Sequence, residues 1–368
     1  MTDNQSKTVL AYIGTYTRNL PHVQAQAEGI YIYRFNPSDG SLTQQEVVTG
    51  IDNPSYLALS PDENYLYAAN EVGDFGGQSS GAVSAFAIDP ASGGLTFINR
   101  QPSGGSAPCH LSVDHSGQYV LSANYTGGSL CVHPIQAGGG LDEASHFIQH
   151  AGSSINPNRQ QEPHAHSINL SPDNRLAFAA DLGMDKLMIY QLADGQLRPH
   201  DQPWVTVQPG AGPRHFDFHP SGRYAYLINE IDNTVIAYAY DGSAGRLSEL
   251  QTIETLPADF SDTSHTADIH VHPSGKFVYG SNRGHDSIVI YAVDEQSGRL
   301  TLVGHESTQG KVPRNFAIDP SGNFLLAANQ NSGTIATYHL DQQSGTLTPT
   351  GHVVEAPTPV CIKMKVIG

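Results

Sequence analysis

Arginine, glutamate and histidine residues recur at related places along the chain, and together they could perform acid–base chemistry on an anionic substrate. Arginine binds phosphate or carboxylate through two parallel hydrogen bonds. Histidine exchanges protons near neutral pH, and a carboxylate can activate water or hold a catalytic histidine. The candidates are His164, His166, Arg214, Glu230, Arg283 and Arg314.

These residues belong to a segment that repeats six times, from about residue 53 to residue 341. Each copy predicts a short apolar strand, a turn rich in Pro, Ser, Asp and Gly, two further strands, and a Gly-x-Leu type step into a fourth strand. Repeats of this length predict a solenoid or a propeller, and four antiparallel strands per unit are typical of a propeller blade. The turn positions that align the copies are Pro61, His115, Pro172, Pro220, Pro273 and Pro320.

The two ends of the chain predict a seventh blade. Residues 9–17, 29–36 and 41–48 have the character of a second, third and fourth strand, and residues 358–363 supply the missing first strand. Pairing them would remove open sheet edges, which invite aggregation. We therefore expect an all-β, seven-bladed β-propeller that forms one domain over residues 1–368, with residues 1–8 as a flexible N-terminal tail. The single Trp204 argues against a WD40 scaffold.

Aligning the copies separates scaffold from candidate function. Nine residues after the turn position every copy has Asn or Asp, which predicts a structural role bonding the following turn. Two other columns change from copy to copy. One residue further on stand Glu71, Tyr125, Leu182, Glu230, Arg283 and Gln330; six residues before the turn stand Ser55, Cys109, His166, Arg214, Ala267 and Arg314.

Strand direction predicts that both variable columns meet. The first and second strands of a blade are antiparallel, so the start of one and the end of the other lie at the same mouth of the central channel. This places the candidates around one cavity, with His164, His265 and Asp268 close behind, whereas His215 should point the other way, into its blade. Long connections over residues 71–81, 142–162 and 255–266 should form its walls or lids.

Composition limits the function classes. Lys and Arg number 18 and Asp and Glu 35, so the net charge is 18 − 35 = −17, which argues against nucleic acid and acidic membranes as partners. An anion site must therefore be a local concentration of basic residues. Three widely spaced cysteines and the lack of an apolar leader or an 18-residue apolar run favour a cytoplasmic protein. A closed propeller buries its own edges, so we expect a monomer that binds a small anionic molecule.

Two other kinds of chemistry are weaker interpretations. His164, His166, Asp181 and His265 could bind a metal, because His-x-His on a strand places both rings together. However, beyond the His-x-His pair no third ligand has dependable spacing, and arginines crowd the site, so we expect no metal and no cofactor. Cys109-His110 could be a nucleophilic pair, but neighbours on a strand should face opposite ways.

The ordered motifs resemble one known family. They include Tyr12-Ile13-Gly14-Thr15-Tyr16, Pro163-His164-Ala165-His166, Gly212-Pro213-Arg214-His215, Asn282-Arg283-Gly284-His285 and Pro357-Thr358-Pro359-Val360-Cys361. The chain is similar, over nearly its whole length, to the seven-bladed propeller lactonases, which include 6-phosphogluconolactonases and carboxy-muconate cyclases. The resemblance implies catalytic roles for His166, Glu230, Arg214 and Arg283, and we add Arg314, His164, Glu71 and His265 as substrate-binding candidates.

The leading hypothesis is a lactone hydrolase, a carboxylic ester hydrolase that opens 6-phosphogluconolactone in the pentose phosphate pathway. Water activated by Glu230 or His166 would attack the carbonyl, while Arg214 and Arg283 bind the anion and the oxyanion. A carboxy-cis,cis-muconate cyclase or lactonising enzyme is the alternative, since it needs the same residue types. A propeller that only binds a partner is the third possibility, because fold alone does not settle function.

Overall fold

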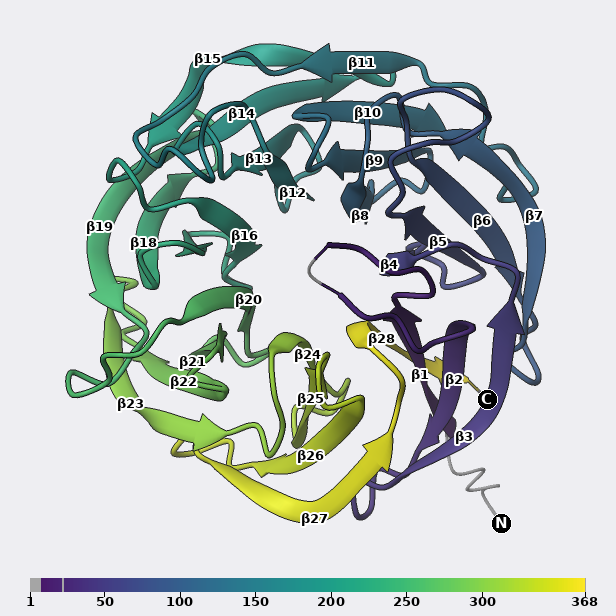
Figure 1. Cartoon of the computed structure of the whole chain (residues 1–368). Coiled ribbons are helices and arrows are strands. Elements are labelled where there is room, and N and C mark those ends of the chain that lie inside the picture. Colours follow the sequence, from purple (N-terminus) through teal and green to yellow (C-terminus); the bar gives the residue numbers. More distant parts are fainter. Residues whose placement is uncertain (1–7, 22, 368) are drawn as a thin grey trace.

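A computed structural model describes residues 8–21 and 23–367, and within those residues every regular element is a β-strand. The strands form seven four-stranded antiparallel sheets arranged in a ring (Figure 1). The predicted all-β, seven-bladed propeller is confirmed. Blades 1–6 follow the chain, and each begins with its innermost strand.

The strand bounds follow the repeat. Blade 1 contains β4 (Pro54–Leu59), β5 (Tyr65–Asn70), β6 (Ala82–Ile88) and β7 (Leu95–Pro102). Blade 2 contains β8 (Pro108–Val113), β9 (Tyr119–Asn124), β10 (Ser129–Pro134) and β11 (His146–Gln149). Blade 3 contains β12 (Ala165–Leu170), β13 (Leu176–Asp181), β14 (Lys186–Ala193) and β15 (Gln196–Thr206).

The remaining blades have the same order. Blade 4 contains β16 (Pro213–Phe218), β17 (Tyr224–Asn229), β18 (Thr234–Asp241) and β19 (Arg246–Glu254). Blade 5 contains β20 (His265–Val271), β21 (Phe277–Arg283), β22 (Ser287–Val293) and β23 (Leu300–Ser307). Blade 6 contains β24 (Pro313–Ile318), β25 (Phe324–Asn329), β26 (Thr334–Leu340) and β27 (Leu347–Glu355). Blade 7 contains β28 (Pro359–Ile367), β1 (Thr8–Thr15), β2 (Gly29–Phe35) and β3 (Leu42–Thr49).

Blade 7 closes the ring by joining the two ends of the chain. Strand β28 lies innermost and pairs antiparallel with β1, with Thr8 opposite Ile367 and Gly14 opposite Cys361. The predicted seventh blade is thus confirmed. Thr8 is already the first residue of β1, and residues 1–7 of the predicted tail lie outside the described residues.

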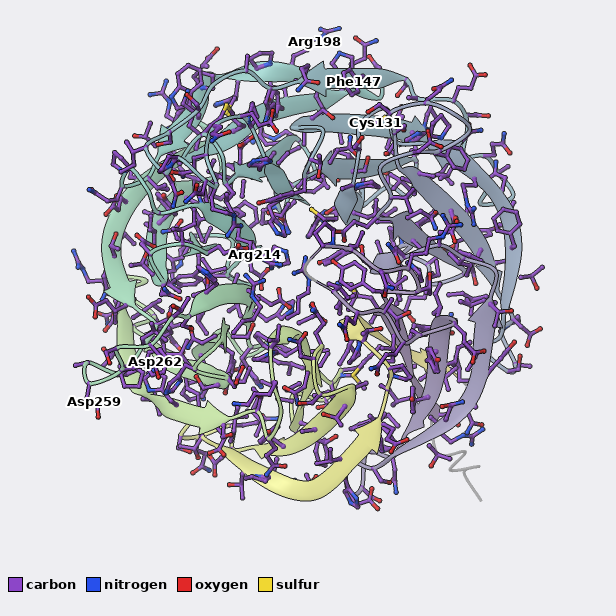
Figure 2. All side chains as sticks on the ribbon, viewed as in Figure 1. Cys131, Phe147, Arg198, Arg214, Asp259 and Asp262 are labelled. Atoms are coloured by element: carbon purple, nitrogen blue, oxygen red, sulfur yellow. The ribbon has the colours of Figure 1, made fainter. Side chains whose placement is uncertain are left out.

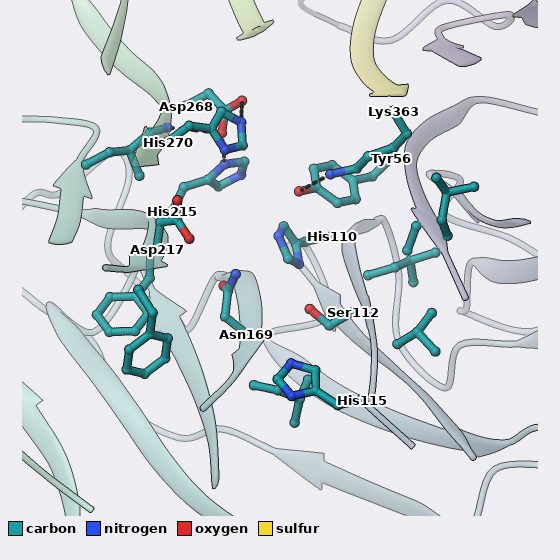
Figure 3. Close-up of a pocket in the computed structure, with 18 of the residues that line it drawn as sticks. Tyr56, His110, Ser112, His115, Asn169, His215, Asp217, Asp268, His270 and Lys363 are labelled. Atoms are coloured by element: carbon teal, nitrogen blue, oxygen red, sulfur yellow. Dashed lines mark hydrogen bonds and ion pairs between the residues drawn. The ribbon is translucent and has the colours of Figure 1, made fainter. Parts of the chain in front are cut away.

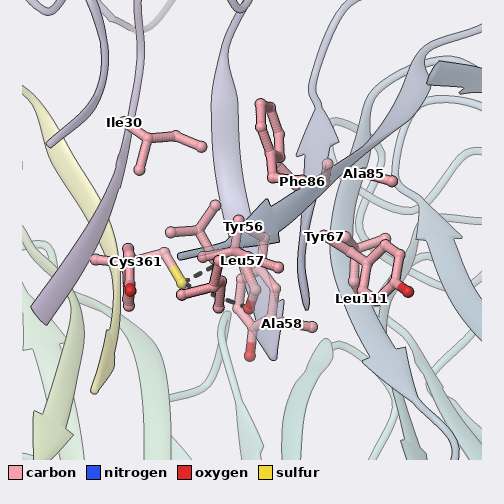
Figure 4. Close-up of a cluster of buried hydrophobic side chains, with 14 of the residues drawn as sticks. Ile30, Tyr56, Leu57, Ala58, Tyr67, Ala85, Phe86, Leu111 and Cys361 are labelled. Atoms are coloured by element: carbon pink, nitrogen blue, oxygen red, sulfur yellow. Dashed lines mark hydrogen bonds between the residues drawn. The ribbon is translucent and has the colours of Figure 1, made fainter. Parts of the chain in front are cut away.

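Apolar side chains fill the spaces between neighbouring blades. Figure 4 shows one such cluster, in which Ile30 and Cys361 of blade 7 pack against Leu57 and Phe86 of blade 1. The Cys361 sulfur also accepts a hydrogen bond from the Leu57 amide at 3.3 Å. All three cysteines are buried free thiols. Each blade therefore completes its apolar core against the next blade.

Tyrosine hydroxyls fasten four pairs of neighbouring blades. Each donates a hydrogen bond to a glycine carbonyl in the turn between the third and fourth strands of the next blade. The glycines have positive φ, and a Cβ there would clash with the adjoining blade, which explains the Gly-x-Leu step in the sequence. The pairs are Tyr12–Gly93, Tyr67–Gly139, Tyr226–Gly298 and Tyr279–Gly345.

The Asn/Asp column is buried scaffold, although its main partners differ from those predicted. Four of its amides donate to a carbonyl in the segment that enters the same blade, rather than bonding the following turn. Asn70, for example, donates to the Asp52 carbonyl at 2.8 Å, and Asn282 donates to the Thr255 carbonyl at 2.9 Å. The column therefore ties each blade to the connection that precedes it.

A β-bulge interrupts the pairing of the innermost strand in blades 1–6. A bulge turns two consecutive side chains toward the same side, here the channel. In β16 it brings Arg214 Nη1 to 3.1 Å from His215 Nε2. The prediction that His215 points into its blade was therefore wrong, because simple alternation does not survive a bulge. Cys109 and His110 likewise both face the channel, each in a different cavity.

The long connections follow the prediction with one correction. Residues 71–81 and 255–264 are loops, but the predicted loop over residues 142–162 contains β11, the short outer strand of blade 2. A further loop, unpredicted, leaves β1 and reaches toward the centre of the ring, described over residues 16–21 and 23–28 (Figure 1).

Candidate functional site

A cavity of about 380 Å³ lies at one mouth of the channel. Seven of its lining residues come from the two variable columns, so the predicted meeting of those columns is what the structure shows. The loop residue Arg159 and His265, at the start of β20, complete it. The lining residues are Glu71, Cys109, Tyr125, Arg159, His166, Glu230, His265, Arg283 and Arg314.

Glu230 is the centre of a dense ion-pair network on one side of the cavity. Its Oε2 accepts from Arg214 Nε at 2.8 Å and lies 2.9 Å from Arg283 Nη2, while its Oε1 accepts from Arg159 Nη2 at 2.5 Å. His166 Nε2 stands 3.9 Å from Oε2. We call these five residues the Glu230 wall.

The network fixes the charge of Glu230. Burial by itself favours the neutral acid, but Arg283, Arg214 and Arg159 outweigh it and hold the pKa of Glu230 well below its usual range. A carboxylate whose oxygens are held by three guanidinium groups is poorly placed to take a proton from water. Glu230 is therefore better suited to orienting guanidinium groups and stabilising a nearby imidazolium than to taking a proton from water.

The pKa of His166 is also lowered, but for an imidazole the result is a neutral group. Burial and the neighbouring Arg214 hold its pKa well below the usual value, so its imidazole is neutral near neutral pH. Nε2 lies on the Glu230 side, whereas Nδ1 faces Cys109 Sγ at 3.7 Å. A neutral ring next to a fixed carboxylate can accept a proton and hold the resulting charge.

Arg214 is placed differently from the prediction. It is among the largest fully buried side chains and does not line the cavity. Its Nη1 donates to the Ala267 carbonyl at 2.5 Å, and its Nε holds Glu230. Figure 2 shows it at the centre of the ring, in contrast to Arg198 on the outer rim. Arg214 therefore holds Glu230 from behind the lining of the cavity and does not itself face the cavity.

Arg159 was missed in the sequence analysis. It lies in the connection from blade 2 to blade 3, where no repeat column covers it, and its Nη2 also donates to the Tyr125 hydroxyl at 3.1 Å. One signal could have found it: it is the only Lys or Arg in residues 142–162, a segment already predicted to form a wall.

The opposite side of the cavity is sparsely paired. Glu71 Oε2 accepts a hydrogen bond from the Tyr16 hydroxyl at 3.0 Å, and the Arg314 guanidinium lies over the Tyr16 ring, 5.7 Å from its centroid. Tyr16 comes from the unpredicted loop after β1. We call Tyr16, Glu71 and Arg314 the Glu71 wall. Within the described residues neither Glu71 nor Arg314 belongs to an ion pair.

Burial dominates the protonation of Glu71. It raises the pKa of Glu71 despite the opposing effects of Arg314, Ser55 and Tyr16. The two glutamates of the cavity thus have pKa values displaced in opposite directions. Such a divergence is the usual mark of separate acid and base roles.

His164 and His265, both predicted to bind substrate, differ in position. His265 lines the cavity. His164 lies behind Tyr125, with the two rings stacked 4.5 Å apart, and its Nδ1 is 3.0 Å from the Tyr125 carbonyl. His164 therefore supports the wall and does not form its surface.

The weaker metal and thiol interpretations can be compared with this geometry. Asp181 bonds His150 at 2.6 Å and the His164 amide at 2.8 Å, away from His166 and His265. In residues 8–21 and 23–367 no three His, Cys, Asp or Glu side chains are grouped to hold a metal ion. Burial also raises the pKa of the Cys109 thiol, which disfavours the nucleophilic thiolate.

A second cavity, of about 440 Å³, has a lining that includes Tyr56, His110, Asn169, His215 and Lys363 (Figure 3). The rings of Tyr56, His110 and His215, which line this second cavity, contact one another. Asp268 bonds His215 Nδ1 at 2.7 Å and His270 Nε2 at 3.0 Å. Burial and Arg214 lower the pKa of His215 to about 4, so this ring is neutral. His215 in turn contacts Arg214, with its Nε2 at 3.1 Å from Arg214 Nη1, and so helps to hold that side chain in place.

The first cavity, lined by the two walls, is locally positive although the protein as a whole is acidic. Arg159, Arg283 and Arg314 line the cavity and Arg214 lies behind Glu230, so four arginines stand against two carboxyl groups and at least two positive charges remain uncompensated. A cavity with this excess and a neutral histidine suits an anionic substrate that undergoes acyl chemistry.

Comparisons with known proteins agree with this chemistry. A family model described as "Lactonase, 7-bladed beta-propeller" matches residues 10–364. A 6-phosphogluconolactonase from Bacillus subtilis is 39% identical over 96% of this chain and 97% of that protein. Another, from Formosa agariphila, is 38% identical over 84% of this chain and 86% of that protein.

A solved structure of a gluconolactonase is also similar to this chain. The periplasmic gluconolactonase of Pseudomonas aeruginosa superposes with a TM-score of 0.91 at 36% identity, covering 98% of this chain and all of that one. Separately, the described part of this chain holds no helix that could span a membrane.

Proposed function

The chain belongs to the seven-bladed β-propeller lactonase family, and we propose that it hydrolyses 6-phosphogluconolactone to 6-phosphogluconate. Two relatives at 38–39% identity carry the name 6-phosphogluconolactonase. The observation that carries the proposal is Arg314. It lines the cavity with no acidic partner among the described residues, and so offers a phosphate a guanidinium that no carboxylate occupies.

We assign the chemistry at the carbonyl to the Glu230 wall. His166 Nε2 takes a proton from the attacking water, and Glu230, 3.9 Å away, stabilises the imidazolium that forms. Between Glu230 and His166 we propose His166 as the base, because three arginines already occupy the Glu230 carboxylate.

Arg283 is the candidate for the developing oxyanion. Its Nη2 is taken by Glu230 and by the Thr266 carbonyl at 2.7 Å, while Nη1 makes no hydrogen bond within the described residues. A donor held in place by a buried carboxylate stabilises negative charge that develops in the transition state without further reorganisation. Arg214 acts through Glu230, which it positions.

We also propose that the enzyme works as a cytoplasmic monomer. The pairing of β28 with β1 leaves blade 7 without an open inner edge, and all three cysteines are free thiols, as expected in a reducing compartment.

Hydrolysis of freshly generated 6-phosphogluconolactone, measured above its spontaneous background, tests the proposal. Unphosphorylated gluconolactone and a muconate-type lactone are run in parallel. We expect the fastest turnover on the phosphorylated lactone, and its loss in His166→Ala. Preference for gluconolactone would replace the substrate assignment, and no acceleration of any lactone would overturn the function.

A further inference from the structure

Opening a lactone requires two proton transfers, and the role proposed for His166 accounts for one of them. Water gives up a proton when it attacks, and the ring oxygen must gain one when it leaves as an alcohol. An aliphatic alkoxide is a poor leaving group, so a positioned acid accelerates this step. Glu230 cannot supply it, because its carboxylate is held ionised by three arginines, so the remaining donors in the cavity are the protonated His166 and a residue outside the Glu230 wall.

Glu71 lies on the other side of the same cavity with the geometry of a proton donor. Its side chain is 7% exposed, and within the described residues no cationic atom lies within 4 Å of either oxygen. Tyr16, fully buried, donates to Oε2 at 3.0 Å. A neutral Glu71 can therefore carry its proton on Oε1, and the Ser55 hydroxyl is the other described side-chain group that bonds this carboxyl.

The covalent structure of the substrate agrees with this position. In a 6-phospho-1,5-lactone the ring oxygen is attached to C5, and C5 also bears the carbon that carries the phosphate. A group that protonates the ring oxygen must therefore sit beside the phosphate site. Arg314, the proposed phosphate ligand, shares Tyr16 with Glu71.

We propose that Glu71 is the general acid of the reaction and delivers a proton from Oε1 to the ring oxygen as the bond to the carbonyl carbon breaks. This assignment rests on the proposed lactonase function. It gives each wall one proton transfer: the Glu230 wall accepts a proton from water, and the Glu71 wall donates one to the leaving oxygen.

The reaction consumes only the lactone and one water molecule. A bond forms between the water oxygen and C1, and His166 takes the proton. The C1–O5 bond then breaks, its electron pair goes to O5, and Glu71 protonates O5. The proton on His166 returns through solvent to Glu71, and the new carboxylic acid ionises.

The surroundings of Glu71 bear on its pH dependence. The titratable or charged groups facing it are Tyr16 after β1, Arg314 on β24, Arg214 on β16 and Cys109 on β8. Burial raises its pKa against the arginines and the Tyr16 hydrogen bond. A bound phosphate dianion next to Arg314 adds like charge and favours the neutral acid further.

The test compares Glu71→Gln and Tyr16→Phe with wild type in kcat and KM for 6-phosphogluconolactone across pH. Glu143→Gln, at an exposed position, removes the same charge as a control. We expect Glu71→Gln to lower kcat about 100-fold with little change in KM, and to abolish the alkaline fall in kcat. Tyr16→Phe should move that fall to higher pH, because the lost hydrogen bond favoured the ionised carboxylate.

Binding of 6-phosphogluconate by calorimetry shows whether each variant keeps an intact site. Wild-type kcat in Glu71→Gln would overturn the acid role, as would an alkaline limb that stays fixed or moves down in Tyr16→Phe. Inactivity of wild type on every lactone is a separate result, which overturns the proposed function itself.

Discussion

The two carboxyl groups of the cavity occupy the same repeat position, one residue past the second strand, yet their surroundings are opposite. Glu230 contacts three arginines, and its pKa lies well below the usual range. Glu71 accepts a hydrogen bond from Tyr16, forms no ion pair in the described part of the chain, and has a raised pKa. One scaffold position thus supplies a permanent anion in blade 4 and a proton donor in blade 1.

The difference arises from which side chains the neighbouring blades present. Blades 4 and 5 each provide an arginine to Glu230, and the loop from blade 2 adds a third. Around Glu71 the adjoining blade 7 contributes the phenol of Tyr16 instead. Pairing fixes a charge, whereas burial without pairing leaves a proton available for transfer.

The largest expected effect comes from removing the base of the Glu230 wall. His166→Ala should lower kcat about 1,000-fold on phosphorylated and unphosphorylated lactones alike, because both need the same water activated. Steady-state rates on the two substrates measure this. A loss confined to one lactone would show that His166 contacts the substrate instead of activating water.

A stability comparison should separate the two glutamates next. Glu230→Gln should lower the free energy of unfolding by about 3–5 kcal/mol, because it leaves buried guanidiniums without their counter-charge. Glu71→Gln breaks no ion pair and should change it by less than about 1 kcal/mol. Denaturant unfolding of the two variants gives both values, and equal losses would contradict the assigned difference.

The pH dependence of the same measurement has opposite signs for the two groups. The depressed pKa of Glu230 stabilises the fold above the unfolded pKa, and this is lost as pH falls through the folded value. The raised pKa of Glu71 contributes stability below the unfolded pKa, which is lost as pH rises through the folded value. As the pH is raised from acid to neutral, the free energy of unfolding of Glu71→Gln should therefore fall less than that of wild type.

Arg314 should have an intermediate effect that is confined to phosphorylated ligands. Arg314→Ala should weaken 6-phosphogluconate binding by about 10–150-fold, the equivalent of 1.5–3 kcal/mol for a charged hydrogen bond, and leave gluconate binding unchanged. Calorimetry measures both. Arg198→Ala, on the exposed rim, is the matched control. An equal loss for both ligands would place Arg314 at the sugar or the carboxylate.

The smallest expected effect belongs to Arg159, whose side chain is 34% exposed. Partly exposed ion pairs contribute about 0.2–1 kcal/mol, so Arg159→Gln should lower kcat/KM less than about sixfold. The effect should diminish with added salt. A loss as large as that for His166→Ala would instead place Arg159 in the chemical step.

Repetition explains why so much of the fold could be predicted. Six aligned copies located the turns and strands, and strand direction alone brought the columns of His166, Glu230 and Arg283 to one mouth. The ends of the chain were assigned to blade 7 because sheet edges must be paired.

What could not be predicted lies where the repeat is broken. His215 and His110 turn toward the channel because each lies at a bulge in its strand. No side-chain pattern in the sequence predicts these bulges. Tyr16 and Arg159 come from loops outside every repeat column, so alignment of the copies cannot place them. The burial of Arg214 beneath Glu230 depends on side-chain packing across blades 4 and 5.

We propose that the Glu230 wall acts on the carbonyl, while Arg314 of the Glu71 wall binds the phosphate. The most direct test is the ratio of kcat/KM for 6-phosphogluconolactone to that for gluconolactone, in wild type, His166→Ala and Arg314→Ala. We expect a ratio that His166→Ala leaves unchanged and that Arg314→Ala lowers at least about tenfold. A ratio that falls in His166→Ala, or survives in Arg314→Ala, would contradict this division of roles.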